Sequence, residues 1–275
     1  MLLQRLISSL FLTALFFYTL LVSHTHIFFF LIVINILVAI GMYEILTFVE
    51  KKGVPVFKLY VIFCGVVLLT TIFACVYKNI QSSDLAASVM LVLFFGLFIL
   101  YSRKSDLSGS LLGVSASIAT VFYVSWLFSF LVRINFLPGV DGRMYIFFIF
   151  FMVFLADVFA YFTGTWLGRH PLAPTISPKK TVEGAFGAAA GALFGAAVSK
   201  FIFVPEVAWH HIISMGLLVG IISQIGDLFE SILKRDAGVK DSGRILPGMG
   251  GVMDLIDGLL FCAPVLYLYL KVFVR

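Results

Sequence analysis

The chain has 275 residues, of which 61% are hydrophobic and 12% are charged, and its formal net charge is +5. A soluble globular protein is about half apolar and about a quarter charged, so this composition excludes an ordinary soluble domain and indicates a membrane protein. In a membrane protein such a modest positive charge reports topology and does not indicate nucleic-acid binding.

Apolar runs long enough to cross a bilayer recur along the whole chain, so a removable targeting peptide does not explain them. A membrane-spanning helix needs about 20 apolar residues, and this criterion predicts an all-α, polytopic integral membrane bundle of about nine helices. The expected spans are 5–23, 26–48, 57–77, 84–102, 108–132, 144–168, 182–204, 209–234 and 251–272. The cysteines lie in apolar runs and are expected to be packing residues.

Lys and Arg are distributed unevenly between the two sides that nine spans define. Thirteen of the 19 fall on the side of the N-terminus. Because cytoplasmic loops are enriched in these residues, the N-terminus is expected in the cytoplasm and the C-terminus outside. Two polar loops rich in Gly, Pro and charge, 168–184 and 234–258, are then both cytoplasmic.

Four aspartates occupy positions that a membrane helix rarely gives to an acid. Asp157 and Asp227 lie inside predicted spans, where a charge costs about 2.5–3.5 kcal/mol on insertion scales, so a functional role is favoured. Asp254 and Asp257 are three residues apart and project from one helix face, where like charges repel unless a metal ion or the Lys and Arg residues of the preceding loop lie beside them. Carboxylates without nearby His or Cys favour Mg²⁺ over zinc. Asp254 alone also fits a structural role at a helix start, where an acid suits the dipole.

Two other patterns are read as structural. Glu230 and Lys234 have the i,i+4 spacing of a helical ion pair. Gly187, Gly191 and Gly195 recur every four residues in one span, a spacing that lets helices pack closely in lipid.

Basic residues gather in the two polar loops. In "TISPKKT", Ser177 is expected to cap a helix that begins at Pro178, which places Lys179 and Lys180 at a helix N-terminus suited to phosphate. Anchoring to the membrane surface is the alternative role for these lysines. In the second loop, glycines that admit a ligand close to the backbone accompany basic residues and the aspartate pair, which together favour a nucleotide or pyrophosphate site. The residues concerned are Lys234, Arg235, Lys240, Arg244, Gly248, Gly250 and Gly251.

The segment "SILKRDAGVKDSGRILPGMGGVMDLID" resembles the signature of the phosphatidate cytidylyltransferases, also called CDP-diacylglycerol synthases. The matching residues are Ser231, Lys234, Arg235, Lys240, Asp241, Pro247, Gly248, Gly250, Gly251, Asp254 and Asp257. The segment "ADVFAYFTGTWLGRHPLAPTISPKKTVEG" is similar to a second stretch of that family, and "SQIGDLFES" to the stretch that leads into the signature. Where the family commonly has a His and an Arg, this chain has Met249 and Leu255, which removes two polar contacts.

The resemblance implies a nucleotidyltransferase that converts CTP and phosphatidic acid into CDP-diacylglycerol and pyrophosphate in phospholipid synthesis. It implies a divalent metal, Mg²⁺, with K⁺ as a further cation. The implied metal ligands are Asp227, Asp254, Asp257 and Asp241, and the implied catalytic residues are Asp227, Asp254, Asp257, Lys234 and Asp157. The implied substrate-binding residues are Ser177, Lys179, Lys180, Glu183, Arg235, Lys240, Gly248, Gly250 and Gly251, with Glu183 orienting a lysine.

The remaining expectations concern partners and placement. CTP is expected from the cytoplasm and phosphatidic acid from the bilayer, and nucleic acid is not a partner. The glycine-rich helix and the family likeness favour a homodimer. Residues 1–143 are expected to be scaffold helices and residues 144–275 the catalytic part. The lack of an N-terminal soluble extension favours a bacterial inner membrane, with the active site facing the cytoplasm.

Two rival functions are weighed against this one. The CDP-alcohol phosphotransferases share an Asp-x-x-Asp-Gly start with "DLIDG", but their pattern continues to two more aspartates, and residues 258–275 contain no acid. A cation-coupled membrane transporter with an intramembrane Asp site is the alternative that stays open. It predicts polar residues spread over several spans and inverted repeats, whereas this chain concentrates charge in its C-terminal half.

Overall fold

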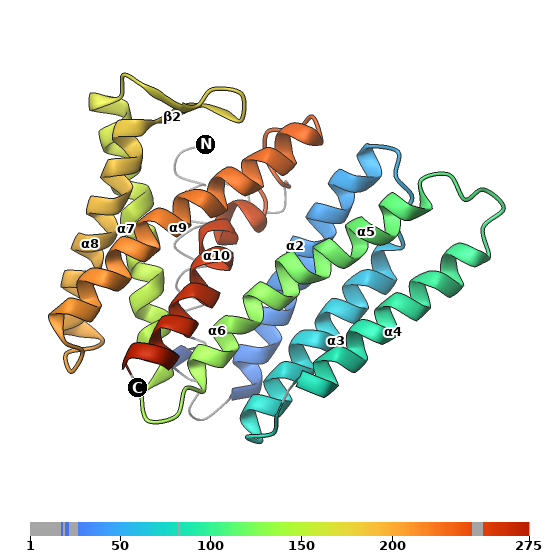
Figure 1. Ribbon diagram of the computed structural model, residues 1–275, viewed down its shortest axis with the longest axis horizontal. Coiled ribbons are helices and arrows are strands. Elements are labelled where there is room, and N and C mark those ends of the chain that lie inside the picture. The colour runs from blue at the N-terminus through green and yellow to red at the C-terminus, as the bar shows by residue number, and fades with distance from the viewer. Residues whose placement is uncertain (1–17, 19, 22–26, 82, 244–249, 275) are drawn as a thin grey trace. The chain divides into compact units, whose positions relative to one another are not determined.

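The computed structural model describes residues 18, 20–21, 27–81, 83–243 and 250–274. Within these residues the protein is mainly helical, with a single short hairpin, and eight helical segments are long and apolar enough to cross a membrane (Figure 1). The expected all-α membrane fold is therefore confirmed. The first predicted span, 5–23, lies almost wholly outside the described residues, so the total of nine stays a prediction.

The eight segments begin and end within one helical turn of the predicted boundaries. Six elements form a span each or most of one: α2 (Ile27–Lys51), α3 (Lys58–Tyr77), α4 (Ser83–Ser102), α7 (Gly142–Leu167), α8 (Val182–Ile202) and α9 (Trp209–Asp236). The other two spans combine α-helix with π-helix: α5 (Ser110–Thr120), η1 (Val121–Trp126) and α6 (Leu127–Asn135), and then α10 (Met253–Tyr269) and η2 (Leu270–Val274). Hydropathy predicts these segments well because the hydrocarbon of a bilayer offers no hydrogen-bond partners to the backbone. Each crossing segment must therefore form a complete helix.

Helix α2 illustrates how an apolar helix divides between protein and lipid. Phe30, Ile34 and Val38 are fully buried, whereas Phe28 and Ile32 on the same helix are 63% and 55% exposed. Both sets are apolar, so the exposed face is suited to contact with lipid. In water such a face would promote aggregation.

Two compact units make up the chain. The first contains Met1–Val132 and Asp236–Leu255, and the second contains Arg133–Arg235 and Ile256–Arg275. In the first unit α3 packs on α2, α4 and η1. The loop before α10 thus belongs to a unit made largely of N-terminal helices, which the sequence did not predict. The assignment of scaffold and catalytic roles on either side of residue 143 stays a prediction.

In the second unit α8 packs along α7 (Figure 1). Small residues of α8 form the contact. A Cβ atom added to Gly187 would overlap Thr163, and one added to Gly195 would lie 3.1 Å from the Cα of Met152. At Gly191 the added atom would overlap the carbonyl oxygen of Leu155. The predicted packing role of these glycines is confirmed.

This close packing predicts a large stability effect for a small change. We expect Gly191→Ala to lower the free energy of unfolding by about 1–3 kcal/mol, because the new methyl group forces α7 and α8 apart. Its thermal midpoint in detergent should fall, whereas Ala190→Leu, on the exposed side of the same helix, should leave the midpoint nearly unchanged. Equal midpoints for Gly191→Ala and the wild type would contradict the packing argument.

A short antiparallel hairpin joins α7 to α8. It consists of β1 (Pro171–Ala173) and β2 (Ser177–Thr181), with Thr181 paired to Pro171. The prediction that Ser177 caps a helix beginning at Pro178 is wrong. Thr181 is the N-cap of α8, and its hydroxyl accepts a hydrogen bond from the Gly184 N–H at 3.1 Å. Strand pairing therefore runs to the cap itself, and Lys179 and Lys180 lie on a strand and not at a helix N-terminus.

Candidate active site

Two glycines bring the helices of the second unit together at the candidate site. A Cβ atom on Gly226 of α9 would lie 2.7 Å from the Asp257 carbonyl oxygen of α10, and one on Gly258 of α10 would lie 3.2 Å from Val153 of α7. Each glycine is adjacent in sequence to an aspartate of the predicted site. The close approach of the backbones therefore places Asp227 and Asp257 near each other.

Three carboxylates converge there. Asp227, Glu230 and Asp257 each offer an oxygen, and these three oxygens lie within 4.8 Å of one another. Asp227 and Glu230 are three residues apart on α9, which puts them on one helix face. Glu230 is buried, and the two aspartates are half-buried. The expectation that Asp227 and Asp257 approach closely enough to share an ion is confirmed.

Lysines partly balance this negative charge. The Lys180 ammonium lies 2.5 Å from the Asp227 carboxylate. The Lys234 ammonium lies 2.5 Å from the Glu230 carboxylate, which confirms the predicted i,i+4 pair. With Asp257 included, three carboxylates face two lysines, so the cluster keeps a net negative charge that would favour a bound cation.

A cavity of about 400 Å³ opens beside Asp227 at the hairpin end of the second unit. Asp157 of α7, Lys179 and Lys180 of β2 and Gln224 of α9 contribute polar groups to its wall. Basic and acidic side chains therefore line the same cavity. The lysines could contact a bound anion, and the aspartates could contact a bound cation. The structure thus brings together four residues that the sequence predicted from one loop and two spans, namely Lys179, Lys180, Asp157 and Asp227.

Other predicted residues hold the hairpin in place. The Glu183 carboxylate accepts hydrogen bonds from the backbone N–H groups of Arg169 and His170, and it lies 2.6 Å from the His170 ring nitrogen Nδ1. These contacts differ from the expectation that Glu183 orients a lysine. Arg235 Nε donates to the Ile176 carbonyl at 3.0 Å, which fastens the hairpin turn to the end of α9.

The signature loop before α10 belongs to the first unit. Asp254 Oδ2 accepts hydrogen bonds from the backbone N–H groups of Ser242 at 2.9 Å and Gly251 at 2.8 Å. This geometry matches the structural reading of Asp254 at a helix start. Gly250 has φ +104°, a conformation that favours glycine, and a Cβ there would lie 2.6 Å from Asp254 Oδ2. Gly248 lies outside the described residues.

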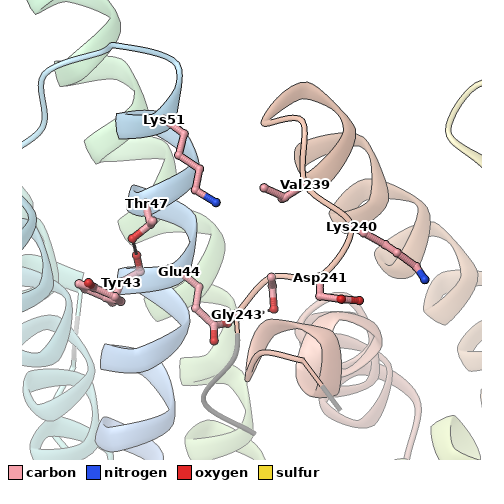
Figure 2. Close-up of a pocket in the computed structure, with 9 residues that line it drawn as sticks. Tyr43, Glu44, Thr47, Lys51, Val239, Lys240, Asp241 and Gly243 are labelled. Carbon is pink, nitrogen blue, oxygen red and sulfur yellow. Dashed lines mark hydrogen bonds between the residues drawn. The ribbon is translucent and has the colours of Figure 1, made fainter. Parts of the chain in front are cut away.

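A second cavity, of about 500 Å³, lies between this loop and α2 within the first unit. Figure 2 shows Lys51 and Glu44 of α2 on one side and Lys240, Asp241 and Gly243 of the loop on the other. The predicted residues Lys240 and Asp241 thus line a cavity in the first unit, whereas Asp157, Asp227 and Asp257 belong to the second.

Sequence reasoning missed two acidic residues. Glu230 was assigned only to an ion pair, although its spacing from Asp227 already put both on one face. Glu44 was not singled out, although it lies inside the predicted span 26–48 and carries the same signal as Asp157. It is 3% exposed and contacts the signature loop.

Residues 3–273, nearly the whole chain, match the sequence model of the Cytidylyltransferase family. The chain belongs to this family. A protein named phosphatidate cytidylyltransferase from Synechocystis sp. is 32% identical over 264 residues, which cover 86% of each chain. Proteins of the same name from Brucella abortus and Bacillus subtilis are 47% and 39% identical over 132 and 151 residues. The match to the Brucella abortus protein covers 48% of this chain and 48% of that protein, and the match to the Bacillus subtilis protein covers 55% and 56%. The chain thus spans about half the length of these two relatives.

The acidic cluster offers the kind of ligands found in divalent-metal sites. Its three ligand groups are hard carboxylate oxygens, which suit Mg²⁺, Ca²⁺ or Mn²⁺ better than softer metals. The carboxylates come from two helices whose backbones are in contact, so their positions do not depend on a loop. Three carboxyl groups converge there, whereas the lysine ion pairs described above involve two of them, Asp227 and Glu230.

Proposed function

We propose that this protein transfers the cytidylyl group of CTP to phosphatidic acid, giving CDP-diacylglycerol and pyrophosphate. The match of residues 3–273 to the cytidylyltransferase family supports this proposal, as do the names of the relatives. These comparisons favour the enzyme over the cation-coupled transporter. The observation that carries the proposal structurally is the placing of Lys179, Lys180 and Asp157 around one cavity with Asp227 of the acidic cluster.

The chemistry asks for charge neutralisation more than for a general base. A phosphate oxygen of phosphatidic acid attacks the α-phosphorus of CTP and forms a new P–O bond. The bond from the α-phosphorus to the bridging oxygen breaks, and pyrophosphate leaves with the electron pair. Because the nucleophile is already an anion, the main barrier is bringing negative groups together. Lys179 and Lys180 line the cavity where they would contact these phosphates.

We assign the metal-binding role to Asp227 and Asp257, with Glu230 beside them, and Asp157 to the nearby wall of the cavity. A bound Mg²⁺ would supply Lewis-acid stabilisation of the phosphate charge. The roles of Asp241 and Asp254 as ligands, of Lys234, Arg235 and Lys240 near the phosphates, and of K⁺ as a further cation remain part of the proposal.

We further propose a bacterial inner membrane with the N-terminus and the active site facing the cytoplasm. The hairpin after α7 and the loop after α9 are separated by two crossings, so they fall on one side of the membrane, and both are rich in Lys and Arg. CTP would reach that side from water and phosphatidic acid from the bilayer. Homodimerisation rests on the family likeness alone, since α7 covers the glycine face of α8 within one chain.

The test is a reaction with purified protein, CTP, Mg²⁺ and phosphatidic acid in detergent micelles. We expect pyrophosphate and CDP-diacylglycerol to form in equal amounts. Replacing phosphatidic acid with diacylglycerol of the same acyl chains removes the attacking phosphate and should abolish both products. Absence of both products with phosphatidic acid, from protein that is shown to be folded, would reject the proposed function.

A further inference from the structure

Glu44 is an acid buried within a membrane-spanning helix and engaged with a distant loop. Its Oε1 accepts a hydrogen bond from the Val252 N–H at 3.0 Å, and its Oε2 accepts one from the Met253 N–H at 2.9 Å. Figure 2 shows its side chain pointing toward the loop that carries Gly243. Val252 and Met253 are at the start of α10, where backbone N–H groups have no partner within the helix. Glu44 supplies that partner from a helix more than 200 residues earlier in the chain.

Ser242 links Glu44 to Asp254. Its hydroxyl oxygen lies 2.7 Å from Asp254 Oδ2 and 3.2 Å from Glu44 Oε2. A hydroxyl has one proton to donate, so Ser242 can donate to only one of these two carboxylates at a time. The Ser242 backbone N–H also donates to Asp254. Glu44, Ser242 and Asp254 therefore form one continuous network within the first unit.

Glycines of the signature loop make room for this network. A Cβ atom on Gly251 would lie 2.5 Å from each carboxylate oxygen of Glu44, and one on Gly243 would overlap Glu44 Oε1. At Gly243 the neighbour that excludes a side chain is Glu44, and at Gly251 it is the Ser242 hydroxyl together with Glu44. The loop backbone therefore lies directly against the Glu44 carboxylate, whereas a carboxylate that faces solvent would not need glycine at these positions.

We propose that Glu44 is a positioning residue that sets the orientation of Asp254 by holding the first turn of α10 and, through Ser242, the Asp254 carboxylate. The inference rests on the proposed function, in which Asp254 is a metal ligand. The hydrogen-bond partners of Glu44 are Ser242, Val252 and Met253. Its two backbone hydrogen bonds fix the residues immediately before Asp254, and the Ser242 hydroxyl fixes one oxygen of the Asp254 side chain.

Hydrogen exchange tests the positioning directly and without reference to activity. We expect Glu44→Gln to speed amide exchange in the peptide containing Val252 and Met253 by about tenfold to a hundredfold, since the charged acceptor is lost. The matched control is Glu50→Gln on the same helix, because Glu50 is exposed and pairs with Lys58. That variant should exchange like the wild type. Unchanged exchange in Glu44→Gln would overturn the inference whatever the protein catalyses.

The dependence of turnover on Mg²⁺ separates positioning from general stability. For Glu44→Gln we expect the Mg²⁺ concentration at half-maximal turnover to rise by about tenfold to a hundredfold, as for residues that orient metal ligands. Ser242→Ala removes the hydroxyl that links Glu44 to Asp254 but keeps the hydrogen bonds from Val252 and Met253 to Glu44. It should therefore raise the half-maximal Mg²⁺ concentration while leaving amide exchange at Val252 and Met253 unchanged. This variant replaces Glu44→Gln in the test if Glu44→Gln does not fold. Wild-type Mg²⁺ dependence in the folded variants would refute the role. A wild-type protein without turnover would instead reject the proposed function, and exchange alone would then decide the role of Glu44.

Discussion

Asp257→Asn is expected to abolish turnover while leaving the protein as stable as the wild type or more stable. One carboxylate oxygen of Asp257 lies within 4.8 Å of an oxygen of Asp227 and of Glu230. The charge of Asp257 therefore repels both neighbours when no cation is bound. The amide keeps the shape of the carboxylate and removes that repulsion. It also removes a metal ligand worth several kcal/mol in the transition state, so turnover should fall by about 10³-fold. Turnover thus falls without a loss of stability, which distinguishes this variant from a misfolded one.

Thermal unfolding with and without Mg²⁺ completes this test. Wild-type protein should gain stability on adding Mg²⁺, because a ligand that binds only the folded state raises its midpoint, and Asp257→Asn should lose most of that gain. Glu206→Gln is the matched control, since Glu206 is an exposed acid of the same unit in the connection between α8 and α9, at the other end of these helices. It should behave like the wild type. Normal turnover and a normal Mg²⁺ response in Asp257→Asn would remove Asp257 from the metal site.

The sequence was sufficient for the spans because one constraint dominates them. A chain in hydrocarbon must satisfy its backbone within each crossing, so apolar length alone locates helices α2 to α10 to within a turn. The same constraint exposed Asp157 and Asp227 as unusual. The approach of Asp227 to Asp257 could be expected from their chemistry, but the helix packing that brings them together could not. It depends on Gly226 and Gly258, which had no distinctive pattern in the sequence.

Local rules failed where a distant partner decided the outcome. Ser177 and Thr181 are both good N-cap residues, and the sequence alone does not choose between them. Pairing of β2 with β1 keeps Ser177–Thr181 extended, which leaves Thr181 as the cap. Glu44 is the converse case. Its position inside a span was a visible signal, but its partners, Val252 and Met253, are too far along the chain to infer from one sequence.

Lys180→Met is expected to reduce turnover by about a hundredfold and to lower stability as well. The Lys180 ammonium lies 2.5 Å from Asp227 and lines the same cavity, so it both balances the acidic cluster and faces the phosphate space. Methionine keeps most of the apolar stem but leaves Asp227 without this cation. Both side chains of this ion pair are partly exposed, so its loss should lower the free energy of unfolding by about 1 kcal/mol. Turnover at saturating CTP and the thermal midpoint are the two measurements.

A double variant separates the two roles of Lys180. In Lys180→Met combined with Asp227→Asn the uncompensated charge is gone, so the midpoint should recover relative to Lys180→Met alone, while turnover stays low because a metal ligand is also lost. Lys179→Met removes the neighbouring cavity lysine, and we expect it to raise KM for CTP with the midpoint unchanged. If the double variant is no more stable than Lys180→Met, the pair with Asp227 does not compensate the cluster. Lys180 would then matter only as a wall of the cavity.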